Sequence, residues 1–291
     1  MMFKNLLVIK EQLPYDHHVL QFAKSLKFLG AEEITLASHL LPHPEKRHEK
    51  YDPEVVSKDL EDLKEMGYTL ESMDLEGLPV EKVHDLVEYM EPYDSLILAG
   101  AKVSSIGKRI FDSEFAYELI QMPSKPILLV RVKEEEDGSF SSIPQDDLNE
   151  MSHVLFPTDF SENAYHAFTY LEKMVEKGLK KVTLMHIQDI AKISPYLDYR
   201  IIEFNQIDRD RLDALRKRLE EKGDVEVEVV LEIGRPFREI NRAIDEKHFD
   251  LVILGRQGKG IMMDLFIGSN SNNLARRAKT SVLLIPRAEE K

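Results

Sequence analysis

The sequence predicts an α/β protein with two tandem doubly wound, Rossmann-like domains, each a five-stranded parallel sheet flanked by helices. Short continuous apolar runs recur along the chain, as expected of parallel strands that are covered on both faces. Between them lie stretches with apolar residues three and four positions apart, which favour helices with one buried stripe. These stripes include Val56, Leu60 and Leu63 in the first half and Leu212, Leu215 and Leu219 in the second.

The same order of elements occurs in both halves of the chain. A constant offset of 148 places Gly30 on Gly178 and residues 34–36 on 182–184. Farther along, the matching segments are 77–79 with 234–236, 93–98 with 249–254, and 126–130 with 281–285. A repeat of about 150 residues indicates a duplicated domain, because solenoid units run only about 20–50 residues.

These matches divide the chain into residues 1–133, a linker at 134–150, and residues 151–291. The linker is predicted because residues 133–142 are charged and then contain glycine and serine, with little to bury. The last strands, 127–130 and 282–285, are apolar edges that need a partner, so we expect the two domains to pair through them as a pseudo-dimer. Helix ends agree with this division, because Ser161 can cap a first turn and glycines follow the expected helices at Gly30, Gly67, Gly178 and Gly223.

The net charge of −14 and the absence of cysteine exclude several classes of function. An acidic surface repels nucleic acids and anionic membranes, and a chain without cysteine has no disulfide, thiolate zinc site or cysteine nucleophile. No apolar run approaches the ~18 residues that cross a bilayer, and the N-terminus shows no signal-peptide pattern. We therefore expect a cytoplasmic protein without nucleic-acid or membrane partners. The histidine pairs His17–His18 and His43–His48 lack HExxH spacing, so we predict no metal site.

One segment of the second half points to a ligand. In a doubly wound sheet the loops after the first and fourth strands meet where strand order reverses, and ligands bind there. Here these loops carry residues 157–161 and the glycines Gly255 and Gly258. Glycine has no Cβ to keep backbone N–H groups away from a phosphate. Residues 268–270 fall at an expected helix N-terminus, whose dipole favours an anion, so the sequence predicts a phosphate-bearing ligand.

The run Pro157-Thr158-Asp159-Phe160-Ser161, the turn at 234–236, Asp250 before a strand, and the spacing Gly-x2-Gly-x9-Gly-Ser resemble the universal stress protein family. The resemblance covers nearly the whole chain, as a tandem form. It implies an adenine nucleotide ligand, ATP or AMP, with or without Mg²⁺. By position, Asp159 would contact ribose or adenine, the backbone of Ile187 would face adenine, and the glycine–serine segment would hold phosphates. The implied binding residues are Pro157, Thr158, Asp159, Ser161, Ile187, Gly255, Arg256, Gly258, Gly268, Ser269 and Asn270.

The first half departs from this motif. Asp159 corresponds to Glu11, and two registers are open for the glycines. Aligned from the strand, the first two glycines fall on Ala99 and Lys102; aligned from the far end, they fall on Gly100 and Val103. The third falls on Asp112 or Ser113, next to Glu114, so at least two of the three glycines are lost in either register. We therefore predict that the N-terminal half does not bind ATP and is structural or regulatory.

Three functions are compatible with these patterns. The first is an adenine-nucleotide-binding stress-response or regulatory protein, since no dedicated catalytic set is evident. The second is a slow ATPase or a nucleotide alpha-hydrolase-type enzyme, for which Arg256 and Lys259 are the available cations. The third is a nucleotide-independent interaction module in which duplication replaces a homodimer interface; a homodimer of the whole chain is also open. His186, at the end of a strand near the site, is expected to be a hydrogen-bonded structural residue.

Overall fold

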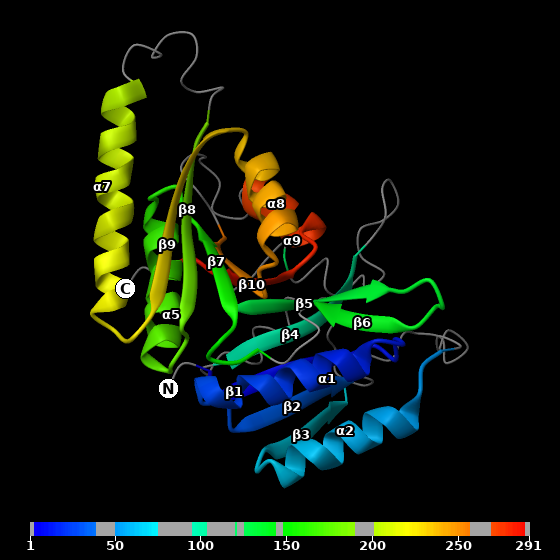
Figure 1. Ribbon diagram of the computed structural model, residues 1–291. Helices are drawn as coiled ribbons and strands as arrows, with labels where there is room; N and C mark the ends of the chain where they lie inside the picture. Colours follow the sequence, from blue (N-terminus) through cyan, green and yellow to red (C-terminus); the bar gives the residue numbers. More distant parts are fainter. Residues whose placement is uncertain are drawn as a thin grey trace. The chain divides into compact units, whose positions relative to one another are not determined.

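The computed structural model describes residues 3–38, 50–74, 95–103, 120, 125–143, 148–189, 201–256 and 269–288. The chain divides into two compact units, residues 1–149 and 150–291. Both units are α/β and contain a parallel sheet (Figure 1), so the predicted fold class is confirmed. Within the described ranges, no helix is long and apolar enough to cross a membrane.

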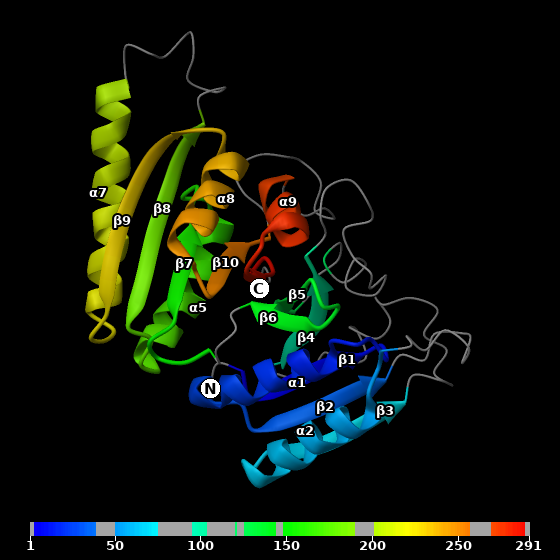
Figure 2. The same ribbon diagram turned by 45° about the vertical axis from the view of Figure 1, so that its right-hand side comes forward.

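The N-terminal unit builds its sheet in the order β3-β2-β1-β4-β5, with all four pairings parallel. Helices α1 and α2 lie side by side (Figures 1 and 2), where Lys24 pairs with Asp59 at 3.1 Å and with Asp62 at 2.7 Å. The elements are β1 (Asn5–Lys10), α1 (Asp16–Ser25), the 3-10 helix η1 (Leu26–Leu29), β2 (Glu33–Ser38), α2 (Pro53–Glu65), β3 (Thr69–Asp74), β4 (Ser95–Lys102), β5 (Ile127–Glu134) and β6 (Phe140–Ile143). The two later helices expected in this half would fall within 75–94 and 104–124, which lie almost wholly outside the described residues.

The C-terminal unit has the same strand order, β9-β8-β7-β10-β11, again with parallel pairings. Helix α7 lies on one side of β8 and β9, and α8 lies on the other (Figure 1). The elements are β7 (His153–Pro157), α5 (Glu162–Glu176), β8 (Lys181–Asp189), α7 (Ile201–Glu220), β9 (Glu226–Gly234), α8 (Pro236–Lys247), β10 (Leu251–Gly255), α9 (Ser269–Arg277) and β11 (Ser281–Ile285).

Strand register shows how far the two units correspond. Asn5 pairs with Glu33 in the first unit, and His153 pairs with Lys181 in the second. Both pairs are related by the offset of 148 that the sequence predicts. The predicted pairing of the two units through their last strands stays a prediction.

The segment expected to be a linker, residues 134–150, is partly folded. Strand β6 lies inside it and pairs antiparallel with β5, from Arg131 opposite Ile143 to Glu134 opposite Phe140. The turn between them is closed by Gly138, which has φ +79°. Charge and small residues predicted a linker, but the chain reverses here and satisfies its backbone groups on the edge of β5.

Most of the predicted helix ends are confirmed. The Ser161 hydroxyl accepts a hydrogen bond from the Ala164 N–H at 3.2 Å and caps α5. Gly30, Gly67 and Gly178 have φ values of +98°, +83° and +110°, as expected just past a helix. Gly223 is different, because a Cβ added to it would lie 3.0 Å from the Val175 carbonyl oxygen, so its role is to let two segments approach closely.

Candidate functional site

The candidate site lies where strand order reverses in the C-terminal unit. Strand β7 is flanked by β8 on one side and by β10 on the other. The chain leaves β7 toward β8 and later returns to β10, so the loops after β7 and β10 diverge at the carboxyl ends of neighbouring strands. Such a point leaves a crevice in which open α/β sheets bind ligands.

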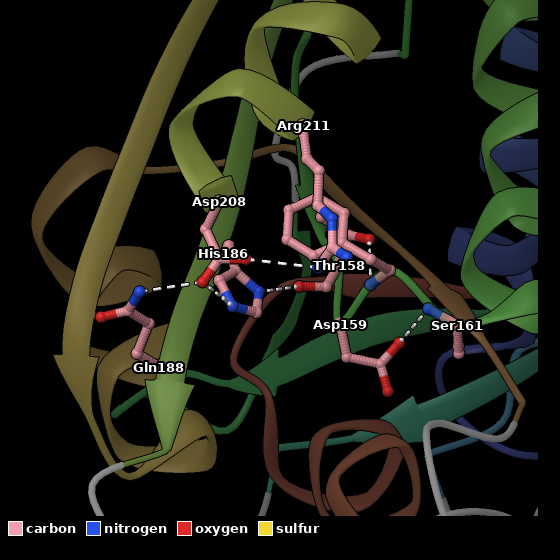
Figure 3. Close-up of polar contacts among 8 residues, drawn as sticks. Thr158, Asp159, Ser161, His186, Gln188, Asp208 and Arg211 are labelled. Carbon is pink, nitrogen blue, oxygen red and sulfur yellow. Dashed lines mark hydrogen bonds and ion pairs between the residues drawn. The ribbon is translucent and has the colours of Figure 1, made fainter. Parts of the chain in front are cut away.

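The loop after β7 is held in one conformation by its own hydrogen bonds. The Thr158 N–H donates to the Met185 carbonyl at 2.9 Å, which fixes the start of the loop on β8. The Thr158 hydroxyl accepts from the Phe160 N–H at 3.0 Å, and Asp159 Oδ1 accepts from the Ser161 N–H at 3.0 Å. Figure 3 shows the Asp159 carboxylate turned toward Ser161 and away from His186. The loop therefore presents Asp159 in a fixed position beside the first turn of α5.

Phe160 has a backbone conformation that bulky residues rarely adopt. Its φ is +57°, in the left-handed region, where a non-glycine residue of this size costs about 1–3 kcal/mol. Its ring lies 4.6 Å from the His186 ring and 5.3 Å from the Arg211 guanidinium. Gln12, which the offset of 148 places on Phe160, has φ +58°. Both units therefore keep the same strained turn after their first strand, although the two side chains are unrelated.

His186 and Asp208 connect this loop to α7 (Figure 3). His186 Nδ1 donates to the Thr158 carbonyl at 2.7 Å, and its Nε2 lies 3.5 Å from Asp208 Oδ2. The same Asp208 oxygen accepts from Gln188 Nε2 at 2.8 Å, and Arg211 Nη1 lies 3.5 Å from Asp208 Oδ1. Both ring nitrogens of His186 thus face protein groups, which agrees with the structural role expected from the sequence.

The sequence did not indicate the other members of this network. Arg211 belongs to the segment 209–222, whose alternating charges predict a solvated helix face, and Asp208 directly precedes that segment. Their spacing of three residues places both on one side of α7, and that side packs over Phe160. Only the position of α7 beside β8 distinguishes them from the neighbouring charged residues.

Gly255, the last residue of β10, lies where two helices begin. A Cβ added to it would lie 2.7 Å from the Asn163 carbonyl oxygen and 3.2 Å from the Ala164 nitrogen, both in the first turn of α5. Its own carbonyl accepts from the Ser271 hydroxyl, in the first turn of α9, at 2.8 Å. The two helix N-termini therefore converge on Gly255. This glycine is required for packing, whatever else it does.

Strand register decides between the two alignments of the glycine motif in the first half. Leu6 pairs with Leu96, and the equivalent Val154 pairs with Leu251, so β4 and β10 are related by an offset of 155. Gly255 then falls on Gly100, Gly258 on Val103 and Gly268 on Ser113. A Cβ added to Gly100 would lie 2.7 Å from the Tyr15 ring at the start of α1. The first glycine is thus retained in both units for helix packing, while the other two are lost from the N-terminal unit.

The remaining predicted residues are placed as follows. Pro157 ends β7, and the Arg256 N–H donates to the Ile285 carbonyl at 2.9 Å. Burial lowers the pKa of the Arg256 guanidinium.

Ile187 was expected just past the second strand, but β8 extends to Asp189 and pairs Ile187 with Glu232 of β9. Ser269 begins α9 and Asn270 is exposed there, whereas Gly258 and Gly268 lie outside the described residues.

Among the described residues, no three His, Asp or Glu side chains are grouped so that they could hold a metal ion. The His17 and His18 rings lie 3.8 Å apart, and His18 Nε2 is 2.8 Å from the Phe140 carbonyl, a hydrogen bond within the unit. His43 and His48 lie outside the described residues.

Residues 150–286 match the sequence model of the Universal stress protein family. A universal stress protein of Methanocaldococcus jannaschii is 25% identical, in an alignment that covers 46% of this chain and 94% of that protein. A solved universal stress protein from Archaeoglobus fulgidus is similar over 99% of this chain and 100% of its own, with a TM-score of 0.61 and 20% identity. A structure of a functionally unknown protein from Pseudomonas aeruginosa covers 98% of this chain and 93% of its own, with a TM-score of 0.61 and 11% identity. The two structures show that the fold extends over both units.

Proposed function

Because the chain belongs to the universal stress protein family through its C-terminal unit, we propose that this unit binds an adenine nucleotide, ATP or AMP, where β7 and β10 diverge. Nucleotide binding then biases the conformation or the partner binding of a stress-response protein. Mg²⁺ accompanies the nucleotide if the ligand is ATP.

The convergence of two helix N-termini on Gly255 supports this proposal most strongly. The first turns of α5 and α9 both contact this residue, through Asn163 and Ser271. Each helix N-terminus carries the equivalent of about half a positive charge, so two of them near one point favour a phosphate. In this proposal the segment from Gly255 to Asn270 holds the phosphates.

In this proposal the nucleoside end lies beside the loop after β7. Asp159 supplies a carboxylate that can accept from ribose hydroxyls or from the adenine amino group. The Met185 carbonyl faces β7, where it accepts from Thr158. Alternate residues of a strand direct their backbone groups to the same side, so the N–H and carbonyl of Ile187 face the space beyond the end of β7. That direction is the one needed for backbone contacts to adenine.

We propose that the N-terminal unit does not bind ATP. Glu11, Val103 and Ser113 occupy the places of Asp159, Gly258 and Gly268. Glu11 is itself buried, at 8% exposure, at the end of β1, and its side chain is one methylene longer than that of Asp159.

Isothermal titration calorimetry with ATP and with AMP tests the proposed site. We expect one site per chain. In the wild type the Ser161 N–H donates to Asp159 Oδ1 at 3.0 Å. The variant Asp159→Asn keeps an oxygen that can accept this bond but removes the negative charge. Its affinity is expected to fall about tenfold or more, which corresponds to about 1.4 kcal/mol. The matched variant Glu11→Gln, at the equivalent position of the N-terminal unit, is expected to leave the affinity unchanged.

Two outcomes would contradict parts of this proposal separately. Two equivalent sites per chain, or equal losses in the two variants, would exclude the assignment to the C-terminal unit. No binding heat and no thermal shift with either nucleotide, together with no nucleotide in natively purified protein, would exclude nucleotide binding itself.

We also propose that the two units are tandem copies that pair through β5 and β11. Because the chain has no cysteine, cysteines introduced together at Val130 and Ile285 can report this pairing. Both positions are fully buried, so no added crosslinker is used: an intramolecular disulfide is expected on oxidation, and its absence in a folded variant would contradict the pairing.

A further inference from the structure

The N-terminal unit contains a cavity of about 320 Å³ at the carboxyl ends of its strands. Three segments line it: the loop and first turn after β1, the start of α2, and the turn between β5 and β6. Its lining includes Leu13, His17, Lys50, Val55, Val56 and Phe140. The volume is at the lower end of the roughly 300–1,000 Å³ that is typical of small-molecule sites.

Specific contacts hold the β5–β6 turn over this cavity. His18 Nε2 lies 2.8 Å from the Phe140 carbonyl, and the Phe140 ring lies 5.7 Å from the Tyr15 ring. On the other side, Lys50 Nζ donates to the Gly138 carbonyl at 2.8 Å. The wall from the hairpin is therefore fixed on both α1 and the segment before α2.

The charges around the cavity are compensated within the protein. Lys50 Nζ lies 3.9 Å from Glu134 Oε1. Asp52 Oδ1 accepts from the Glu54 N–H at 2.9 Å and from the Val55 N–H at 3.3 Å, as the cap of α2. Burial lowers the pKa of His17, so its imidazole is neutral near pH 7. Among the described lining residues, the charged side chains Lys50 and Asp52 both have partners within the protein, and most of the lining is apolar.

We propose that this cavity binds a small, uncharged ring compound, packed between Val55, Val56 and Phe140 and hydrogen-bonded to the His17 imidazole. The site is separate from the nucleotide site proposed for the C-terminal unit. It lies at the carboxyl ends of the strands of the N-terminal unit, the end of the sheet at which we propose that the C-terminal unit binds phosphate.

Methyl-labelled NMR of the full chain, titrated with indole, tests this site. We expect saturable shifts of the Val55 and Val56 methyl signals. Val55 is 40% exposed on the cavity wall, so Val55→Phe can fill the space without a rearrangement of the core. This variant is expected to weaken indole binding at least tenfold while the melting temperature stays the same, and Val55→Met is expected to give a smaller loss.

The matched control is Ile233→Phe, an enlargement at a residue of similar exposure, 42%, in the C-terminal unit. It is expected to leave indole binding unchanged. Indole-2-carboxylate is expected to bind more weakly than indole. No saturable shift at Val55 and Val56, or equal indole affinity in Val55→Phe, Val55→Met and the wild type, would overturn the site. Tighter binding of the carboxylate would overturn the assignment to uncharged ligands.

Discussion

Gly255 contacts the backbone of Asn163 so closely that an added Cβ would lie 2.7 Å from the Asn163 carbonyl oxygen. Because the obstacle is backbone in the first turn of α5, the variant Gly255→Ala has to move β10 or α5. We expect a loss of about 1–3 kcal/mol in the free energy of unfolding, as for an overpacked core, measured by urea denaturation. Unchanged stability together with lost nucleotide binding would instead show that this glycine serves the phosphate.

Gly100→Ala is the matched change in the N-terminal unit. There the added Cβ would meet the Tyr15 ring at 2.7 Å, a side chain that can adjust more readily than backbone. We expect a smaller loss of stability than for Gly255→Ala and no change in nucleotide affinity.

Arg211 covers the strained loop at Phe160. The guanidinium lies 5.3 Å from the ring, a cation–π contact worth about 0.5–1 kcal/mol at an exposed position. We expect Arg211→Ala to lower stability by that amount and to weaken nucleotide binding, because the loop that carries Asp159 becomes less ordered. Arg209→Ala, an exposed residue of the same helix, is the control, and equal effects of the two variants on binding would contradict this role.

Ser161 caps α5 through its hydroxyl, which accepts from the Ala164 N–H at 3.2 Å. Replacement of an N-cap serine by alanine costs about 1 kcal/mol, so Ser161→Ala is expected to lower the free energy of unfolding by that amount. It is also expected to weaken nucleotide binding, because this cap lies next to Asp159. Asp52→Ala removes the side-chain N-cap of α2 in the other unit and is expected to cost similar stability with no effect on nucleotide affinity.

Asp16 makes the stability of the N-terminal unit depend on pH. Burial, and then the nearby Glu11, raise the pKa of Asp16 from 3.8 to about 8. The unfolded chain loses this proton near pH 4 and the folded chain near pH 8, so the folded state binds more protons between these values. Stability contributed by the protonated form is therefore lost as pH rises from about 4 to 8.

The variant Asp16→Asn keeps the neutral shape and is expected to remove this loss. Urea denaturation measures the free energy of unfolding of the variant and of the wild type at pH 5 and at pH 9. The difference, variant minus wild type, is expected to be larger at pH 9 than at pH 5 by about 2–5 kcal/mol. Asp224→Asn, at a side chain that is 96% exposed, should show no such difference. Parallel pH profiles of Asp16→Asn and the wild type would disprove the raised pKa.

The sequence was sufficient for the fold class and for part of the candidate site. Apolar runs and helical spacing depend on residues close together in the chain, so they predicted the parallel strands and the cap at Ser161. The loop around Asp159 is also local, since its bonds join residues two or three positions apart. The offset of 148 was visible for the same reason, because each half repeats the same local pattern.

Only the tertiary structure showed the contacts between residues that are far apart in the chain. The His18 ring is hydrogen-bonded to the Phe140 carbonyl, 122 positions away in the chain. This bond holds a hairpin in place where the sequence predicts a linker. Register between β1 and β4 selected Gly100 as the counterpart of Gly255, and only the packing of β10 on α5 showed why both are glycine. Composition and spacing cannot predict such contacts, because the contacts depend on how sheets and helices pack together. The sequence by itself therefore determined the kind of fold and suggested the class of ligand that we propose, and the packing determined what Gly100, Gly255 and the segment that follows β5 do.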